Sequence, residues 1–219
     1  MRCAAAIRWL KSSVPCSLIQ KECASVADGS LHSCSAFSQL EPVSTAGLAI
    51  EVREDLTKAS FAAAKGNVQA VCATIREAYA VELPRRPGRV EGRGVAFVWT
   101  GPDQWLALAE GANGRDLELE LKSRLTGLAS VVDQSDGRVI VRVAGPMATE
   151  VLAKGVPIDL HPRVFGVNSA AVTHASHIGI VIWRLDDAPT FEIAMFRSFA
   201  DSFTHWLLDS ARAAAAAAG

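Results

Sequence analysis

Apolar and polar residues recur at regular spacings from about residue 56 onward, and these spacings predict short strands that alternate with helices. The first helix is marked by apolar residues three and four positions apart, which is typical of one buried helix face: Val68, Val71, Cys72, Ile75 and Tyr79. Asn67 stands where an N-cap is expected, and Pro84 follows the end of the pattern. We therefore expect an amphipathic helix that begins after Asn67.

Four strands and a second helix complete this half of the pattern. The expected strands are Lys58–Lys65, Val95–Thr100, Trp105–Ala109 and Ala129–Gln134. Arg115–Leu128 alternates like a strand over its first residues, but its length and its Leu, Glu and Lys content favour a helix. The resulting order, β-α-β-β-α-β, is that of a ferredoxin-like, or split βαβ, unit.

The residues after Gln134 predict a second unit of the same kind. Asp136-Gly137 favours a tight turn, and four strands are expected after it: Arg138–Ala144, Ala171–Ser176, Ile178–Arg184 and Thr190–Phe196. A short helix is expected to begin at Gly145-Pro146 and to end at Gly155, because proline is favoured at the first position of a helix and glycine after its end.

The last predicted helix opens at Ser198, with Asp201 as a capping acid. Its expected buried stripe consists of Phe199, Phe203, Trp206 and Leu207. The alanines at 213–218 favour helix but offer little surface to bury, so we expect this end to fray.

These elements predict an α+β fold with two tandem units, residues 45–135 and 136–212, followed by an alanine-rich tail, residues 213–219. Residues 1–44 differ from the rest: they contain nine serines, four of the five cysteines and no sustained periodicity. Three basic residues among small apolar ones faintly resemble a transit peptide. We interpret the segment as a disordered extension or as the product of a translation start placed too far upstream.

The composition limits the function classes. The 219 residues include 22 Lys or Arg and 23 Asp or Glu, which gives a formal net charge of −1. This balance argues against general electrostatic binding of nucleic acid or of an anionic membrane. No apolar run reaches the ~20 residues that a membrane-spanning helix needs. An odd number of cysteines without a C-x-x-C pair fits a reducing compartment, so we expect a cytoplasmic protein.

None of the candidate catalytic or metal-binding motifs lies in the structural context that its chemistry requires. His174 and His177 form an H-x-x-H pattern on a predicted strand or hairpin, where their side chains would point to opposite faces. Gly92-Arg93-Gly94 precedes a strand instead of following one, and it lacks the third glycine of a dinucleotide-binding loop. There is no G-x-S-x-G motif and no Walker A motif. We assign no catalytic, cofactor-binding or metal-binding residue.

The stretch Pro84–Arg93 carries four arginines. The simplest interpretation is a solvated loop. The functional alternative is contact with the carboxylates of a partner protein, because the planar guanidinium favours such pairs and prolines stiffen the loop. Under this alternative we expect Arg85, Arg86 or Arg89 to lie in a protein interface.

Five separated segments resemble one known family in the same order. They are Gly101–Leu106 (GPDQWL), Asp133–Arg138 (DQSDGR) followed by Gly145-Pro146, Lys154–Phe165 (KGVPIDLHPRVF), Asp186–Phe191 (DDAPTF) and Arg197–Ala211 (RSFADSFTHWLLDSA). Together they are similar to the gamma subunits of heterotetrameric sarcosine oxidases, over about residues 56–211.

This resemblance implies a fold like that of the folate-binding aminomethyltransferases and a structural role beside alpha, beta and delta subunits. The complex oxidises sarcosine to glycine with O2 and tetrahydrofolate, giving H2O2 and methylenetetrahydrofolate. FAD, FMN, NAD and the folate site are expected in the partner subunits, and none in this chain. Two alternatives stay open: a stand-alone folate-binding protein of this fold, and the equivalent subunit of a complex that oxidises N-methylglutamate or dimethylglycine.

Overall fold

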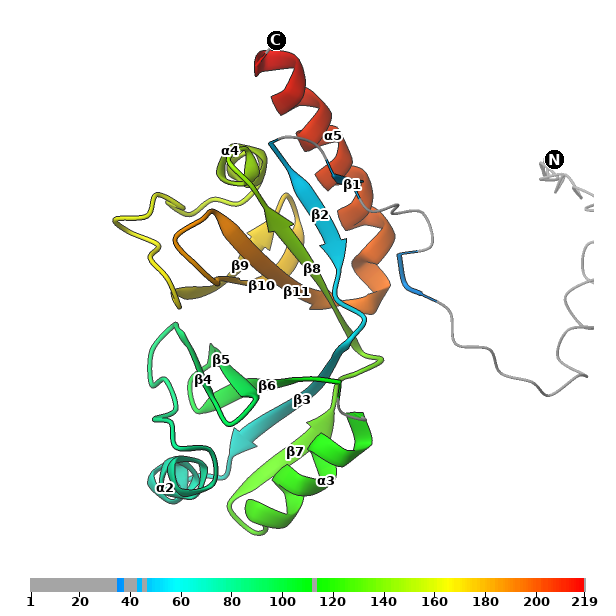
Figure 1. Ribbon diagram of the computed structural model, residues 1–219. Helices are drawn as coiled ribbons and strands as arrows, with labels where there is room; N and C mark the ends of the chain where they lie inside the picture. The colour runs from blue at the N-terminus through cyan, green and yellow to red at the C-terminus, as the bar shows by residue number, and fades with distance from the viewer. Residues whose placement is uncertain (1–34, 38–42, 45–46, 112–113, 219) are drawn as a thin grey trace, which may run out of the picture. The chain divides into compact units, whose positions relative to one another are not determined.

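Two antiparallel β-sheets form the centre of the fold in the computed structural model, which describes residues 35–37, 43–44, 47–111 and 114–218 (Figure 1). All of these residues belong to one unit, Ser35–Gly219. One sheet has five strands in the order β4-β5-β6-β3-β7, and the other has six in the order β1-β2-β8-β11-β10-β9. The fold is therefore mixed α+β with two sheets, as the sequence predicts.

The five-stranded sheet and its two helices come from the first half of the described chain. Its strands are β3 (Leu56–Ala63), β4 (Arg89–Gly92), β5 (Val95–Gly101), β6 (Gln104–Glu110) and β7 (Ala129–Asp133). The helices are α2 (Val68–Tyr79) and α3 (Gly114–Arg124).

The six-stranded sheet contains most of the second half. Its strands are β1 (Val43–Ser44), β2 (Ala49–Val52), β8 (Arg138–Ala144), β9 (Ala170–Ala175), β10 (Ile178–Arg184) and β11 (Thr190–Phe196). The helices are α4 (Ala148–Ala153), the short 3-10 helix η1 (Arg197–Phe199) and α5 (Ala200–Ala218).

The two sheets have the same topology. The order β4-β5-β6-β3-β7 of the first corresponds, strand for strand, to β9-β10-β11-β8-β2 of the second. In the second sheet the last position is filled by β2, which precedes the first unit in the chain and pairs antiparallel with β8. The first unit thus has the predicted ferredoxin-like order with β4 as an additional edge strand, and the second reaches the same arrangement with β2, a strand from the N-terminal side.

Strand β2 departs from the predicted division of the chain at residue 135. Residues 49–52 precede the first unit, yet Ile50 pairs with Val143 and Val52 with Val141 of the second. The strand has only four residues, and no turn signal links it to its distant partner, so periodicity alone did not predict it.

Three further differences concern the Pro84–Arg93 stretch and the C-terminal helix. Pro84–Arg93 is not entirely a loop, because Arg89–Gly92 forms the edge strand β4, paired with β5. At the other end, α5 continues through the alanine run as far as Ala218, and Ala214 is fully buried where we expected fraying. Phe199 of the predicted buried stripe is exposed, whereas Phe203 and Leu207 are in the core.

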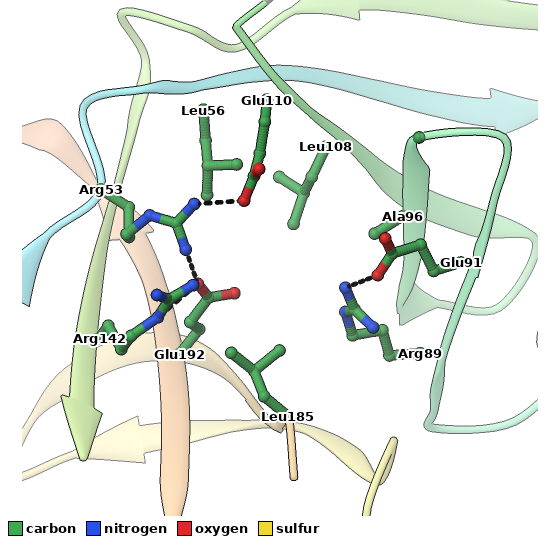
Figure 2. A pocket seen from close by; sticks show the side chains of 11 residues that line it. Arg53, Leu56, Arg89, Glu91, Ala96, Leu108, Glu110, Arg142, Leu185 and Glu192 are labelled. Carbon is green, nitrogen blue, oxygen red and sulfur yellow. Dashed lines mark hydrogen bonds and ion pairs between the residues drawn. The ribbon is translucent and has the colours of Figure 1, made fainter.

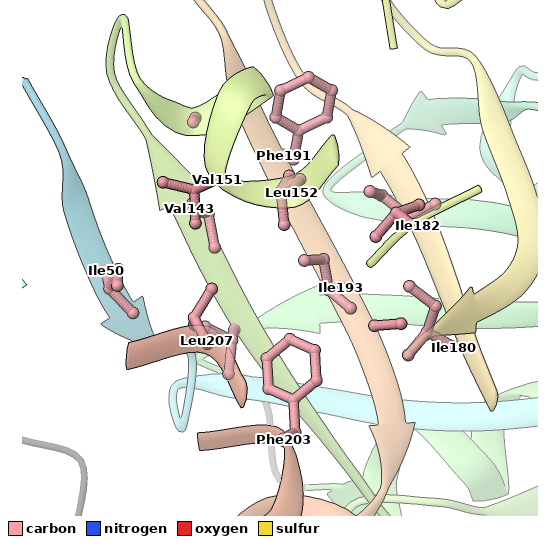
Figure 3. Packing of buried hydrophobic residues seen from close by; sticks show 14 of the residues in the cluster. Ile50, Val143, Val151, Leu152, Ile180, Ile182, Phe191, Ile193, Phe203 and Leu207 are labelled. Carbon is pink, nitrogen blue, oxygen red and sulfur yellow. The ribbon is translucent and has the colours of Figure 1, made fainter. Parts of the chain in front are cut away.

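The hydrophobic core has three parts. Residues of α2 and α3 pack on one face of the five-stranded sheet, and residues of α4 and α5 pack on one face of the six-stranded sheet (Figure 3). The third part contains residues of both sheets and none from the helices: Leu56, Ala96, Val98, Leu106, Leu108, Ile140, Ala170, Val181, Trp183 and Ala194. The sheets therefore meet face to face, and we call these meeting faces the inner faces.

We predict that removing the Ile50 side chain destabilises the protein. Ile50 is fully buried in the core beneath α5, so Ile50→Ala leaves a cavity and should lower the free energy of unfolding by about 3 kcal/mol in a urea titration. The control is Val132→Ala on β7, which removes an exposed side chain and should change stability by less than about 0.5 kcal/mol. Equal effects of the two substitutions would show that β2 is not part of the cooperative core.

Candidate functional site

A pocket of about 450 Å3 lies between the inner faces of the two sheets (Figure 2). Its walls combine charged groups with small and aliphatic side chains, and residues of both sheets contribute: Arg53, Leu56, Arg89, Glu91, Gly94, Ala96, Leu108, Glu110, Arg142, Leu185 and Glu192. Figure 2 shows Arg53, Arg142 and Glu192 grouped on one side and the Arg89–Glu91 pair on the other.

Glu192 is the centre of the first group. It lies on β11, and its carboxylate is almost fully buried. Oε1 accepts hydrogen bonds from Arg53 Nη1 at 2.7 Å and from Arg142 Nη2 at 2.8 Å, and Oε2 accepts one from Trp183 Nε1 at 3.0 Å. Every partner of the carboxylate is a donor, which is the arrangement that an ionised carboxylate needs when it is removed from water.

Arg53 connects this group to the five-stranded sheet. It lies in the three-residue link, 53–55, between β2 of one sheet and β3 of the other, and its backbone N–H donates to Ile140 O at 2.9 Å. Its guanidinium also donates to Asp55 through Nε at 2.9 Å and Nη2 at 2.8 Å, and to Glu110 Oε1 at 2.7 Å. One buried cation thus pairs with Asp55 of the link, with Glu110 of the five-stranded sheet and with Glu192 of the six-stranded sheet.

The pKa values of these groups follow from burial and from this pairing. The hydrogen bonds from Arg53 lower the pKa of Asp55 below its usual range. The hydrogen bonds to Asp55 and Glu110 and the charge of Glu192 raise the pKa of Arg53, although burial lowers it. Arg53 therefore keeps its charge. Burial raises the pKa of Glu192, and the charge of Arg53 opposes this rise. A lone carboxylate at this depth would be costly, and the two arginines supply the compensation.

Arg89 on β4 forms the opposite wall. Its guanidinium pairs with Glu91 and donates through Nη1 to Asn168 Oδ1 at 3.4 Å, while its backbone N–H donates to Asn168 O at 2.8 Å. Its Nε is buried and has no hydrogen-bond partner within the described part of the chain. Of the three arginines predicted to meet a partner protein, this one is therefore engaged inside the chain.

The other two predicted interface residues remain on the surface. Arg85 and Arg86 precede β4 and are exposed, as a docking role requires. The adjacent segment around Asn168 reaches this loop from the other sheet through the bond to Arg89, and it presents the exposed side chain of Val167. Arg85 and Arg86 thus belong to the loop that leads to Arg89, where the chain contacts the segment around Asn168.

The two histidines and the Asp186-Asp187 pair lie on a strand or in turns. His174 is exposed on β9, whereas His177 lies in the following turn with its Nδ1 3.0 Å from Ser176 Oγ. Within the described ranges, no group of three or more His, Cys, Asp or Glu side chains is arranged to hold a metal ion. No helix among these residues is long and apolar enough to cross a membrane. The Asp186-Asp187 turn offers backbone carbonyls to Arg184.

Periodicity alone did not identify the Arg53–Glu192–Arg142 group. The usable signal was a charged residue inside an apolar alternation: Arg142 interrupts RVIVRVA, and Glu192 interrupts TFEIAMF. Such residues at otherwise buried positions indicate a partner of opposite charge. Their register, Arg142 opposite Glu192, becomes visible only when β8 and β11 are paired.

The fold is shared with an aminomethyltransferase. The glycine cleavage system aminomethyltransferase T from Bartonella henselae superimposes with a TM-score of 0.54 at 18% identity, over 76% of this chain and 47% of that one. At this identity the likeness concerns the fold alone. It confirms the expected resemblance to the aminomethyltransferase fold.

The chain belongs to the sarcosine oxidase, gamma subunit family, whose model matches residues 63–214. Sarcosine oxidase subunit gamma of Corynebacterium sp. (strain P-1) is 38% identical over 141 residues, which cover 63% of this chain and 68% of that protein. The corresponding protein of an Arthrobacter species is 37% identical over the same coverage. A chain of heterotetrameric sarcosine oxidase from Corynebacterium sp. U-96 superimposes with a TM-score of 0.66 at 32% identity, over 77% of this chain and 86% of that one.

These relatives confirm the family predicted from the five motifs. They favour the sarcosine oxidase prediction over a stand-alone folate-binding protein and over the subunit of another N-methyl amino acid oxidase.

We predict that Glu192 stabilises the fold far more than Glu110, although both pair with Arg53. Glu192→Ala leaves two arginines at a buried site without their shared carboxylate and should lower the free energy of unfolding by about 3–5 kcal/mol. Glu110→Ala removes a carboxylate that is 72% exposed and should cost less than about 1 kcal/mol. Urea titrations at pH 7 compare them, and a cost for Glu192→Ala as small as for Glu110→Ala would contradict the role assigned to the buried group.

Proposed function

We propose that this chain is the gamma subunit of a heterotetrameric sarcosine oxidase and that it acts there as a structural subunit required for assembly. The observation that carries this proposal is the likeness to one chain of the solved heterotetrameric enzyme, at 32% identity and over 86% of that chain. The likeness covers both sheets, so the shared feature is a whole fold and not a single motif.

The complex that we propose oxidises sarcosine to glycine. Two electrons reduce O2 to H2O2, and tetrahydrofolate accepts the methyl carbon as methylenetetrahydrofolate. FAD, FMN, NAD and tetrahydrofolate are assigned to the alpha and beta subunits, and a delta subunit completes the heterotetramer. We place the complex in the cytoplasm.

The pocket between the sheets supports a structural role for this chain. The carboxylate of Glu192 is fully used by Arg53, Arg142 and Trp183, and Arg53 also holds Asp55 and Glu110. Groups engaged in this way hold the two sheets together, and a proton-transfer role would require them to exchange partners at each turnover. The site therefore fits a rigid subunit that acts through its surface.

Co-expression tests this function. The full chain, carrying an affinity tag, is produced together with the alpha, beta and delta subunits encoded by the same organism. We expect the four chains to co-purify in equal amounts and to form H2O2 when sarcosine and O2 are supplied. A tagged chain that is recovered alone, while the other three form an active complex without it, would contradict the proposal.

We further propose that Arg85 and Arg86 contact acidic groups of a partner subunit. They are exposed, they lie on a loop that contains Pro84 and Pro87, and the exposed Val167 lies on the neighbouring segment. Arginines next to apolar surface are common in interfaces, because the planar guanidinium pairs with carboxylates and also packs on apolar groups.

Charge reversal at this loop should separate docking from folding. Arg85→Glu combined with Arg86→Glu should weaken binding to the partner subunits at least tenfold at low salt, with a smaller loss at physiological salt, and leave the melting temperature nearly unchanged. Arg89→Glu, the matched third variant, should lower the melting temperature of the isolated chain, because Arg89 pairs with Glu91 and Asn168. Undiminished assembly of the double variant at both salt concentrations would show that the loop is only a solvated connector.

A further inference from the structure

The inner face of the six-stranded sheet extends beyond the area that the five-stranded sheet covers. Along β8, β11 and β10, Ile140, Ala194 and Val181 lie side by side in the inter-sheet core and are almost completely buried. The next pair of residues on the same face of β8 and β11 is Arg138 with Phe196, and there Phe196 is 49% exposed. The five-stranded sheet therefore covers the row of Ile140, Ala194 and Val181 but not the next row, which contains Phe196.

Three neighbours on the same face are also open. Val172 of β9 lies opposite the buried Val181, yet it is 51% exposed. His174 and Gly179 form the next pair along β9 and β10, and both are exposed. A Cβ added to Gly179 would meet no atom within 4 Å, so the space above this glycine is empty in the described part of the chain. We call Arg138, Val172, His174, Gly179 and Phe196 the open face.

Arg138 is the charged member of the open face. Its guanidinium lies over the ring of Phe196, 4.3 Å from the ring centroid, which is within the range of a cation–π contact. Burial lowers the pKa of Arg138, and no carboxylate opposes this effect. The contact with the ring restrains the guanidinium, so less conformational entropy is lost when it binds an anion.

A comparison with Arg142 shows what Arg138 lacks. Both side chains belong to the inner face of β8, four residues apart. Arg142 pairs with Glu192 at 2.8 Å and approaches Glu51 at 3.7 Å. Among the residues that the structure describes, no Asp or Glu side chain forms an ion pair with Arg138. A half-buried guanidinium next to exposed apolar surface is partly removed from water, which costs free energy, and no carboxylate of the described residues compensates this cost.

We propose that the open face is a docking site for another subunit of the oxidase, which places a carboxylate on Arg138 and an apolar side chain above Gly179. This inference rests on the proposed function. The carboxylate follows from the charge of Arg138, which no Asp or Glu of the described residues pairs, and the apolar side chain follows from the empty space above Gly179 and the exposed side chains of Phe196 and Val172 on the same face. Aromatic residues and arginine are enriched in interfaces, and charged groups at their centres are paired.

Gly179 makes a sharp test possible. Gly179→Tyr fills the empty space and leaves the isolated chain intact, because the glycine has ordinary backbone angles and no neighbour above it. It should therefore block docking by steric overlap without lowering the melting temperature. Ala73→Tyr, at an exposed position of α2 on the opposite side of the five-stranded sheet, is the matched control and should bind normally.

Arg138→Gln tests the predicted carboxylate. The full-length variants are titrated against the complex of the other three subunits by biolayer interferometry, at low and at physiological salt. We expect Gly179→Tyr and Arg138→Gln each to weaken binding at least tenfold, and Arg138→Gln to lose the salt dependence that one ion pair contributes. Arg76→Gln, which removes an exposed arginine of α2, should have no effect.

The outcomes separate this inference from the proposed function. If the unaltered chain does not bind the other subunits, the proposed function fails. If it binds, and Gly179→Tyr and Arg138→Gln both bind as tightly as the unaltered chain, the open face is not an interface and the inference is wrong. If the isolated chain dimerises and Gly179→Tyr abolishes the dimer while binding to the other subunits is unchanged, the occupant is a second copy of this chain, which also overturns the inference.

Discussion

The buried carboxylate of Glu192 is the group on which the arrangement of the two sheets depends. It holds Arg142 of its own sheet and Arg53 of the link between the sheets, and Arg53 in turn reaches Glu110 at the end of β6. Hydrophobic contact brings the inner faces together but is not directional. Hydrogen-bonded ion pairs are directional, so this group favours one placement of the two sheets relative to each other.

The same geometry explains why the site resembles a binding pocket without offering free chemistry. A cavity of about 450 Å3 with six charged side chains would suit a small polar ligand. Here the charged side chains pair with one another within each wall of the cavity. On the same strand, Arg138 lies on the open face and forms no ion pair with an Asp or Glu among the residues that the structure describes, whereas Arg142 pairs with Glu192. Position within one strand thus decides whether an arginine stabilises the fold or remains available for an interface.

Most of the elements could be predicted from the sequence, because they depend on local periodicity. Helix α2 begins after Asn67, and β8 spans the predicted RVIVRVA. Strand β2 could not be predicted, since its four residues are stabilised by β8, far along the chain. The Arg53–Glu192–Arg142 group was missed because the local signal, a charge inside an apolar alternation, names no partner, and only the pairing of distant strands brings the charges together. Arg89 was assigned to a loop because the edge strand β4 contains one apolar residue, Val90, and shows no alternation.

The place of β2 in the second sheet has a consequence for synthesis on the ribosome. The chain emerges from its N-terminal end, so β2 leaves the ribosome before β3, and its partner β8 follows only after the entire first unit has been made. At roughly 5–20 residues per second this interval lasts several seconds. The last strand of the first unit, β7, is complete just before β8 is made, and until then the side of β2 that pairs with β8 remains without its partner. Four residues are too few to form an extended edge for aggregation, and the shortness of β2 therefore protects the nascent chain until the second sheet is complete.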